Sequence, residues 1–301
     1  EALNSYREAI DGQILQEGIC EAGAIASFIA AGTAYATFAV PTIPFYIFYS
    51  MFGFQRVGDM IWASADMMAR GFLLGGTAGR TTLNGEGLQH QDGHSPILAS
   101  TVPSVRTYDP AFAWELAILV QYGISRMFIE DHDELFYLMM YNEALPMPPR
   151  PELPDLEEGV IRGGYCLESV VGEGPRINLL GSGTILFEVM EAASRLREEG
   201  FAVAVYSITS YIELARDAER ASHSNETSWL SHLFSEPSVP IIAASDYVRT
   251  LPRMIASWVP GPMVALGTDG FGMSERREAL RAHFRIDAQA IAEAARSLVN
   301  A

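Results

Sequence analysis

Residues 75–95 read GGTAGRTTLNGEGLQHQDGHS, a stretch in which glycines are interspersed with side chains capable of acid–base chemistry. Apolar runs precede it at 71–74 and follow it at 96–99, so the pattern predicts a buried strand that leads into a long polar loop. Loops at strand ends usually carry the functional residues of an α/β domain. We therefore interpret this stretch, named the 75–95 loop, as functional; a solvated surface loop is the alternative that composition leaves open.

Around this loop, apolar runs of strand length alternate with segments of helical spacing. The alternation predicts an α/β protein with mainly parallel sheets and right-handed crossovers.

Five prolines within 146–154 cannot continue a helix or a central strand, so they predict a linker between two three-layer domains, residues 1–150 and 151–301. Asp109, followed by proline, is expected to cap a helix. Helices are expected at 18–38, 51–70, 109–128, 183–199 and 211–221 and from 276 onward, and strands at 43–49, 71–75, 103–107, 135–141, 177–181, 202–207, 240–245 and 263–267.

Residues 22–55 carry no formal charge and resemble a membrane span in composition. Glycine and prolines interrupt this run, and its period changes from helical to strand-like. We therefore interpret it as a helix, a turn and a central strand at 43–49, all buried, with a membrane segment as the alternative.

The composition excludes some partners. A net charge of −17 argues against binding to nucleic acids or anionic membranes, because both need a basic face. The two cysteines, Cys20 and Cys166, have no metal-binding spacing, and the polar first residues give no sign of a signal peptide. These features favour a reduced, cytoplasmic setting.

Four stretches carry a resemblance to a known family: residues 43–56 (IPFYIFYSMFGFQR), residues 71–95, residues 205–217 (VYSITSYIELARD) and residues 266–287 (LGTDGFGMSERREALRAHFRID). In this order they resemble the C-terminal half of the homodimeric, transketolase-like pyruvate dehydrogenase component of bacteria. The resemblance implies a transketolase-like pyrimidine-binding domain followed by a transketolase C-terminal-like domain. It also implies thiamine diphosphate and Mg²⁺ as cofactors.

One motif of that family does not occur in the sequence. The family's polypeptide begins with a diphosphate-binding domain, in which a Gly-Asp-Gly motif and a following asparagine hold Mg²⁺ and the diphosphate; no Gly-Asp-Gly occurs here. The other half is expected either as a separate subunit or as a part that has been removed. As a split subunit, the chain would join a diphosphate-binding partner in an assembly of two copies of each.

The resemblance assigns roles to Glu21, Tyr49 and Phe52. Glu21, in GICEAGA, matches the cofactor-activating glutamate, whose carboxyl bonds a pyrimidine nitrogen and promotes the imino tautomer of the ring. The uncharged run after it is expected to form an apolar wall that suits proton sharing. Tyr49 and Phe52 match the pocket for the ring, with Phe52 stacking on it. Without the resemblance, Glu21 is equally explained as a helix N-terminal acid, and both aromatics as core residues.

In the 75–95 loop we single out Glu86, His90, Asp92 and His94 as catalytic candidates. Imidazoles titrate near neutrality, so they can protonate a developing alkoxide or orient a substrate carboxylate. Asp92 is expected to orient one imidazole and set its tautomer. The spacing His-x-Asp-x-His also permits a metal site, which stays open on sequence alone. Arg80 is expected to brace the loop.

These observations predict a subunit of a thiamine diphosphate-dependent enzyme that decarboxylates a 2-oxo acid and transfers the acyl or hydroxyalkyl group. Pyruvate with a lipoyl acceptor, on a lipoyl domain or carrier protein, is the default that the resemblance implies. A transketolase-like or acyloin-forming carboligase is one alternative, and a non-catalytic assembly subunit is another. An intact Glu21 and an intact loop speak against the latter.

Overall fold

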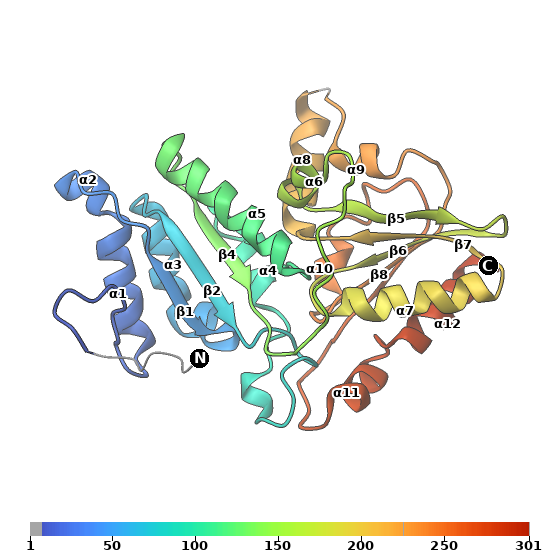
Figure 1. Cartoon of the computed structure of the whole chain (residues 1–301), viewed down its shortest axis with the longest axis horizontal. Coiled ribbons are helices and arrows are strands. Elements are labelled where there is room, and N and C mark those ends of the chain that lie inside the picture. Colours follow the sequence, from blue (N-terminus) through green and yellow to red (C-terminus); the bar gives the residue numbers. More distant parts are fainter. Residues whose placement is uncertain (1–7, 225, 301) are drawn as a thin grey trace.

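The computed structural model describes residues 8–224 and 226–300, which form two α/β units side by side (Figure 1). Each unit has one sheet with helices on both faces, and both sheets are mainly parallel. The chain passes between the sheets through residues 140–153, which carry no helix or strand and contain the predicted proline-rich linker. The expected two-domain α/β class is confirmed, while the boundary at residue 150 stays a prediction.

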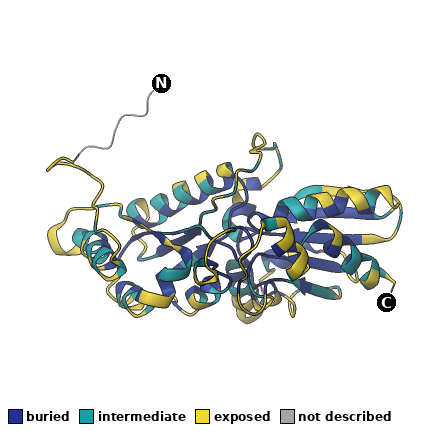
Figure 2. Ribbon diagram, turned by 90° about the horizontal axis from the view of Figure 1, so that it is seen from below, coloured by how far each residue is buried: buried dark blue, intermediate teal, exposed yellow. Residues whose placement is uncertain are grey.

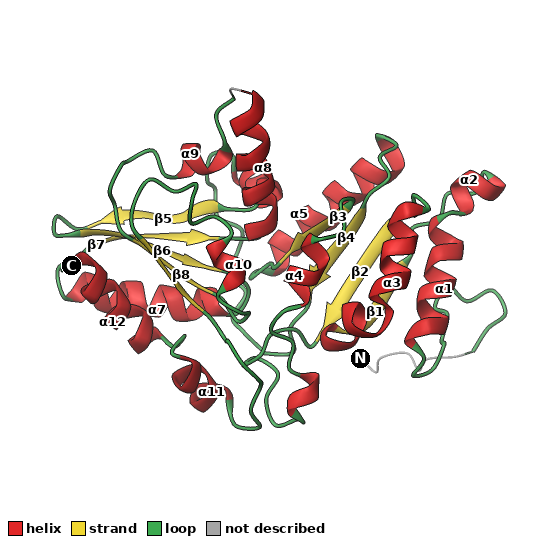
Figure 3. Ribbon diagram, turned by 180° about the vertical axis from the view of Figure 1, so that it is seen from behind, coloured by secondary structure: helices red, strands yellow, loops and turns green. Residues whose placement is uncertain are grey.

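The first sheet is parallel throughout. Its strands are β1 (Phe45–Tyr49), β2 (Gly71–Gly76), β3 (Val105–Tyr108) and β4 (Leu135–Met139), in the spatial order β1-β2-β4-β3. Its helices are α1 (Glu21–Gly32), α2 (Ala34–Phe38), α3 (Gly53–Asp66), α4 (Ser95–Ser100) and α5 (Ala113–Ile124), the last continued by a π-helical turn, Ser125–Ile129. Apolar residues of α1, α3 and α4 share a core with one sheet face, and α5 packs on the other (Figure 3).

The prediction that residues 43–49 form a central, buried strand is wrong. β1 is an edge strand, and its outward side chains Phe45, Ile47 and Tyr49 are 45%, 72% and 47% exposed. The strand is apolar on both faces, but α5 covers only the neighbouring strands on that side. A continuous apolar pattern indicates that both faces of a strand are buried in the working protein. It does not show whether the residues that bury each face belong to the same chain.

The second sheet has one antiparallel edge strand that the sequence did not suggest. Its strands are β5 (Tyr165–Val171), β6 (Arg176–Gly181), β7 (Ala202–Ser207), β8 (Ile241–Ala244) and β9 (Met263–Leu266), in the order β5-β7-β6-β8-β9. Its helices are α6 (Leu156–Arg162), α7 (Ile185–Glu198), α8 (Tyr211–Ser224), α9 (Trp229–Leu233), α10 (Thr250–Arg253), α11 (Arg277–Phe284) and α12 (Ala288–Val299). Residues of α7 and α12 pack on one face, and residues of α8, α9 and α10 on the other.

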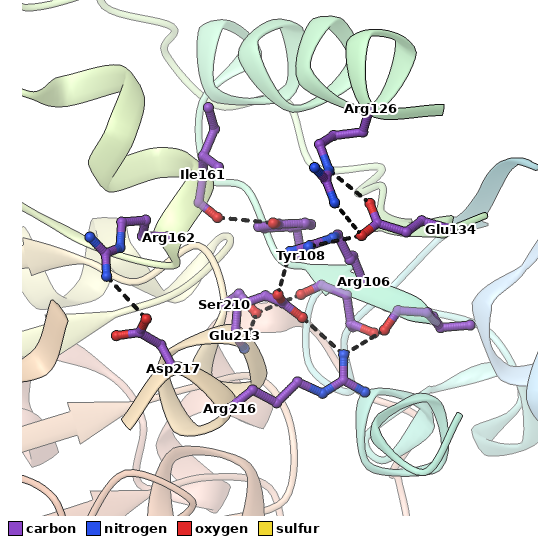
Figure 4. Close-up of polar contacts among 12 residues, drawn as sticks. Arg106, Tyr108, Arg126, Glu134, Ile161, Arg162, Ser210, Glu213, Arg216 and Asp217 are labelled. Carbon is purple, nitrogen blue, oxygen red and sulfur yellow. Dashed lines mark hydrogen bonds and ion pairs between the residues drawn. The ribbon is translucent and has the colours of Figure 1, made fainter. Parts of the chain in front are cut away.

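Buried residues run continuously through the junction between the two units (Figure 2). An ionic network crosses this junction (Figure 4): Arg106 of β3 lies 2.8 Å from a carboxylate oxygen of Glu213 in α8 and 2.9 Å from one of Glu134. Arg216, also in α8, donates to the backbone carbonyls of Val105, Ser100 and Val102 at 2.7, 3.1 and 3.1 Å. The second unit therefore holds the turn that follows α4.

Asp109 lies fully inside this junction rather than capping a helix. Its carboxylate accepts a hydrogen bond from the Tyr141 hydroxyl, and its backbone N–H donates to the carbonyl of Thr209 at 2.7 Å. Burial raises the pKa of the Asp109 carboxyl to about 7, although hydrogen bonds from Tyr141 and Ser182 oppose the rise. The predicted N-cap at Asp109 is therefore wrong.

The helix predicted to begin at Asp109 begins instead at Ala113. The carboxylate of Glu115 accepts hydrogen bonds from the backbone N–H groups of Ala111 and Phe112 at 2.6 and 3.1 Å, so it satisfies the donors at the helix start. No helix among the described residues is long and apolar enough to cross a membrane.

Candidate active site

The candidate site lies where β1 and β2 end, since both strands are parallel and their following segments meet at the same sheet edge. Glu21 is the first residue of α1 and reaches this edge. Its carboxylate oxygen lies 2.7 Å from a guanidinium nitrogen of Arg56, and the two side chains are 20% and 49% exposed. This ion pair is a charged contact that the expected apolar wall around the carboxyl did not include.

An aromatic cluster forms the next part of the site. The ring centres of Tyr49 and Phe52 lie 5.5 and 5.1 Å from that of His90, and 6.0 Å from each other. The guanidinium carbon of Arg56 lies 3.8 Å from the ring centre of Phe52. Phe52, Arg56 and Glu21 thus lie in succession, so Arg56 connects Glu21 with Phe52, and Phe52 in turn contacts His90 of the 75–95 loop.

Glu86 and His90 form a pair within the 75–95 loop. A carboxylate oxygen of Glu86 lies 3.4 Å from Nδ1 of His90, and the two side chains are 43% and 27% exposed. Nδ1 is enclosed and makes no hydrogen bond within the described part of the chain. A small adjustment of Glu86 would give this enclosed nitrogen its hydrogen bond.

Asp92 does not orient an imidazole, contrary to the expectation. It is completely buried, and its carboxylate accepts hydrogen bonds from the Ser50 hydroxyl and from the backbone N–H groups of His94 and Ser95, the latter two at 3.0 and 2.9 Å. These bonds fix the start of α4. The His94 ring instead contacts the side-chain amide of Gln55, and its Nδ1 lies 3.4 Å from a guanidinium nitrogen of Arg80.

The 75–95 loop is held from the second unit. Arg80 is 4% exposed and donates to the backbone carbonyls of Thr268 and Gly270, which agrees with the bracing role expected for it. The buried carboxylate of Asp246 accepts hydrogen bonds from the backbone N–H and hydroxyl groups of both Thr81 and Thr82. The loop conformation therefore depends on residues more than 160 positions away in sequence, such as Asp246, 164 positions from Thr82.

The metal site left open by the His-x-Asp-x-His spacing can be compared with this geometry. Among residues 8–224 and 226–300, no group of three His, Cys, Asp or Glu side chains is arranged to hold a metal ion.

Comparisons with known families agree with this architecture. A profile described as "Pyruvate dehydrogenase E1 component middle domain" matches residues 2–148, and one described as "Transketolase-like TK C-terminal domain" matches residues 163–287. The pyruvate dehydrogenase E1 components of Corynebacterium glutamicum and Escherichia coli K12 are 52% and 47% identical to the chain, over 95% and 98% of its length. The chain belongs to the pyruvate dehydrogenase E1 family. This is a family of thiamine diphosphate-dependent enzymes.

The chain spans about a third of the length of these relatives, 32% and 34%. Solved structures share its fold at low identity. Transketolase from Leishmania mexicana has a TM-score of 0.68 at 17% identity, covering 86% of this chain and 34% of that one. A structure titled "Split gene transketolase, inactive beta4 tetramer" has a TM-score of 0.68 at 17% identity, covering 94% of this chain and 83% of that one.

The residues of this E1-family chain fit the aminopyrimidine ring of thiamine diphosphate. Arg56 provides the test, because its guanidinium is planar, donates an N–H to Glu21 and lies on the Phe52 ring. A pyrimidine ring that carries a proton on nitrogen offers the same combination of flat shape and N–H donor. The His90 ring, which packs edge-on against Phe52, places an imidazole beside this position.

Sequence reasoning missed two residues of this site, Gln55 and Arg56. Both lie in the 43–56 stretch that carries the resemblance, but neither was singled out. Arg56 follows Phe52 by four positions, and side chains at this spacing meet on one helix face. That spacing is the signal that could have connected Arg56 with the predicted ring pocket.

Proposed function

We propose that the chain forms the pyrimidine side of a thiamine diphosphate site in an enzyme that decarboxylates a 2-oxo acid and transfers the resulting acyl group. Pyruvate is the proposed substrate, and a lipoyl group carried on a protein domain is the proposed acceptor. The observation that carries the proposal is the pair Glu21 and Phe52, which enclose a planar N–H donor in a chain of the pyruvate dehydrogenase E1 family.

When bound, thiamine diphosphate supplies the carbon nucleophile and electron sink that 2-oxo acid decarboxylation requires. Glu21 would hold the cofactor's pyrimidine ring through a hydrogen bond to a ring nitrogen, and it would keep a shared proton at its carboxylate oxygen. Phe52 would stack on the face of that ring, and Tyr49 would close its edge. These three residues bind and orient; the glutamate also moves a proton.

We assign substrate handling to the 75–95 loop. His90 would hold a proton at Nε2 for a substrate oxygen, and Glu86, whose oxygen lies 3.4 Å from Nδ1, would orient the ring from its enclosed side. His94 would bond the carboxylate of the 2-oxo acid, supported by the positive charge of Arg80 next to its ring. Asp92 would act as a positioning residue, because it bonds the backbone that carries His94.

The diphosphate and Mg²⁺ would be bound by residues that the described chain does not contain. The sequence has no Gly-Asp-Gly motif, and the relatives are about three times as long as this chain. We propose that a diphosphate-binding segment, either continuous with this chain or a separate subunit in an assembly of two copies of each, packs beside Glu21. The exposed apolar face of β1 and the beta4 title of the split-gene neighbour support this proposal.

The experiment is Glu21→Gln in the complete enzyme. An amide accepts a hydrogen bond but shares no proton, so hydrogen–deuterium exchange at the thiazolium carbon should slow by about 10²–10⁴-fold while the fold survives. Glu191→Gln, at an exposed position of α7, is the matched control. Wild-type exchange in Glu21→Gln would refute the assignment of this glutamate.

A further inference from the structure

A buried hydroxyl joins the two parts of the candidate site. Ser50 lies between Tyr49 and Phe52 in the chain, directly after β1, and it is completely buried. Its Oγ donates a hydrogen bond to the carboxylate of Asp92 in the 75–95 loop, and the Ser95 hydroxyl donates in return to the backbone carbonyl of Ser50 at 3.2 Å. The turn that carries the two aromatic rings is therefore bonded in both directions to the segment around His94.

The surroundings of the Ser50 hydroxyl leave it little freedom. The Tyr137 hydroxyl of β4 lies 3.1 Å from the same Oγ and is also completely buried. Gly75 of β2 packs against both groups, since a Cβ atom at this position would lie 2.9 Å from the Tyr137 hydroxyl and 3.1 Å from the Ser50 Oγ. The lack of a side chain at Gly75 thus makes room for a row of hydrogen bonds from Tyr137 through Ser50 to Asp92.

Asp92 extends this fixed position to His94. The same carboxylate accepts hydrogen bonds from the backbone N–H groups of His94 and Ser95 at 3.0 and 2.9 Å. A buried carboxylate that bonds several donors has little freedom to turn, because a rotation would leave donors unpaired. A shift at Ser50 would therefore move the backbone of His94. The Glu21 carboxylate bonds Arg56 and lies outside this row of hydrogen bonds among the described residues.

We propose that Ser50 is a positioning residue: its hydroxyl sets the distance between the pocket formed by Tyr49 and Phe52 and the substrate-binding His94. This inference rests on the proposed function, and it separates two steps of the reaction. Proton sharing by Glu21 needs the pocket alone, whereas the reaction of the 2-oxo acid also needs His94 at the correct distance. Loss of the Ser50 hydroxyl impairs the second step and leaves the first one intact.

The test is Ser50→Ala in the complete enzyme, with pyruvate as the substrate. A misplacement of about 1 Å can cost about 100-fold in rate, so kcat/KM for pyruvate should fall about 10–100-fold. Hydrogen–deuterium exchange at the thiazolium carbon should keep the wild-type rate. Ser64→Ala is the matched control and should keep the wild-type kcat/KM, because Ser64 in α3 is equally buried but its hydroxyl makes no hydrogen bond within the described part of the chain.

A second variant, Asp92→Asn, separates hydrogen bonding from charge. The asparagine oxygen can accept the two backbone N–H groups while its amide donates to the Ser50 Oγ, so the connection persists without the carboxylate. We therefore expect Asp92→Asn to keep a kcat/KM for pyruvate well above that of Ser50→Ala. Thermal unfolding checks that both variants fold.

Each outcome decides the proposal. Unchanged kcat/KM in Ser50→Ala would mean that the hydroxyl positions nothing, and equal losses in kcat/KM and in exchange would mean that it supports the whole site. An Asp92→Asn variant no better than Ser50→Ala would assign the effect to the charge of Asp92. Each of these results overturns the inference and leaves the proposed function intact, whereas a wild-type enzyme that shows neither exchange nor turnover of pyruvate overturns both.

Discussion

The buried carboxyl of Asp109 predicts a specific pH dependence of stability. It lies inside the junction between the two units, bonded by Tyr141, and near the buried carboxyls of Asp246 and Glu115. Burial raises its pKa from 3.8 to about 7, with the charge of Asp246 adding to the rise. Ionising this group in the folded protein is therefore costly, and replacing it by Asn removes that cost.

The sign and size of this pH effect follow from the pKa of Asp109 in the unfolded and folded states. The folded state binds the proton more tightly than the unfolded state, so the free energy of unfolding decreases as pH rises from about 4 to about 7. A rise from 3.8 to about 7 corresponds to about 4 kcal/mol once the group is fully ionised, of which about 2–3 kcal/mol is lost between pH 5 and pH 8. The amide of Asn brings a buried N–H at a cost of about 1–3 kcal/mol, equal at every pH.

The assay is urea unfolding of wild type and Asp109→Asn at pH 5, 6, 7 and 8. The difference between their free energies of unfolding should move by about 2–3 kcal/mol in favour of the variant across this range. Asp246 and Glu115 titrate in both proteins, so their contributions largely cancel. Asp59→Asn, at an exposed position of α3, should show no such change. A pH-independent difference between Asp109→Asn and wild type would show that the buried carboxyl is not the titrating group.

Two further substitutions test the site and the junction. His90→Ala should lower turnover by about 10²–10⁴-fold with cofactor affinity nearly unchanged, because a positioned acid–base group is lost; His132→Ala, an exposed histidine, serves as control, and unaltered turnover would exclude His90 from proton transfer. Arg216→Met should lower the free energy of unfolding by about 1–3 kcal/mol, since three carbonyls lose a charged donor. Arg220→Met, on the same helix and 59% exposed, should cost less, and equal losses in the two variants would contradict the bracing role.

The sequence predicted most elements of the fold because their patterns are local. Strands such as β4 and β7 are short apolar runs bounded by turns, and both occur where expected. β5 was missed because its burial declines from Tyr165 to three exposed residues at its end, and its pairing is irregular. β1 was placed at the centre of the sheet because its outward face is apolar, although the residues that the structure describes leave this face exposed.

The candidate site was predictable in its members but not in their partners. Phe52 and His90 follow the ends of β1 and β2, and their rings meet, while Glu21 at the start of α1 is linked to Phe52 through Arg56. The ion-pair partner of Glu21 was not predicted. Arg56 reaches Glu21 because α3 packs beside α1, and no local sequence pattern encodes that packing. Asp92 was misjudged for a related reason: its neighbours in sequence are histidines, but its carboxylate turns inward to Ser50 and the backbone.

The hydrogen bonds between the 75–95 loop and the second unit limit how chimeric enzymes can be built. Arg80 bonds carbonyls at Thr268 and Gly270, and Asp246 bonds Thr81 and Thr82, so the loop sequence and these distant positions form one module. A recombination point in the proline-rich linker would separate the two halves of that module. An engineer who exchanges the second domain must therefore move residues 80–82 with it, or transfer Asp246 and the 268–270 turn in return.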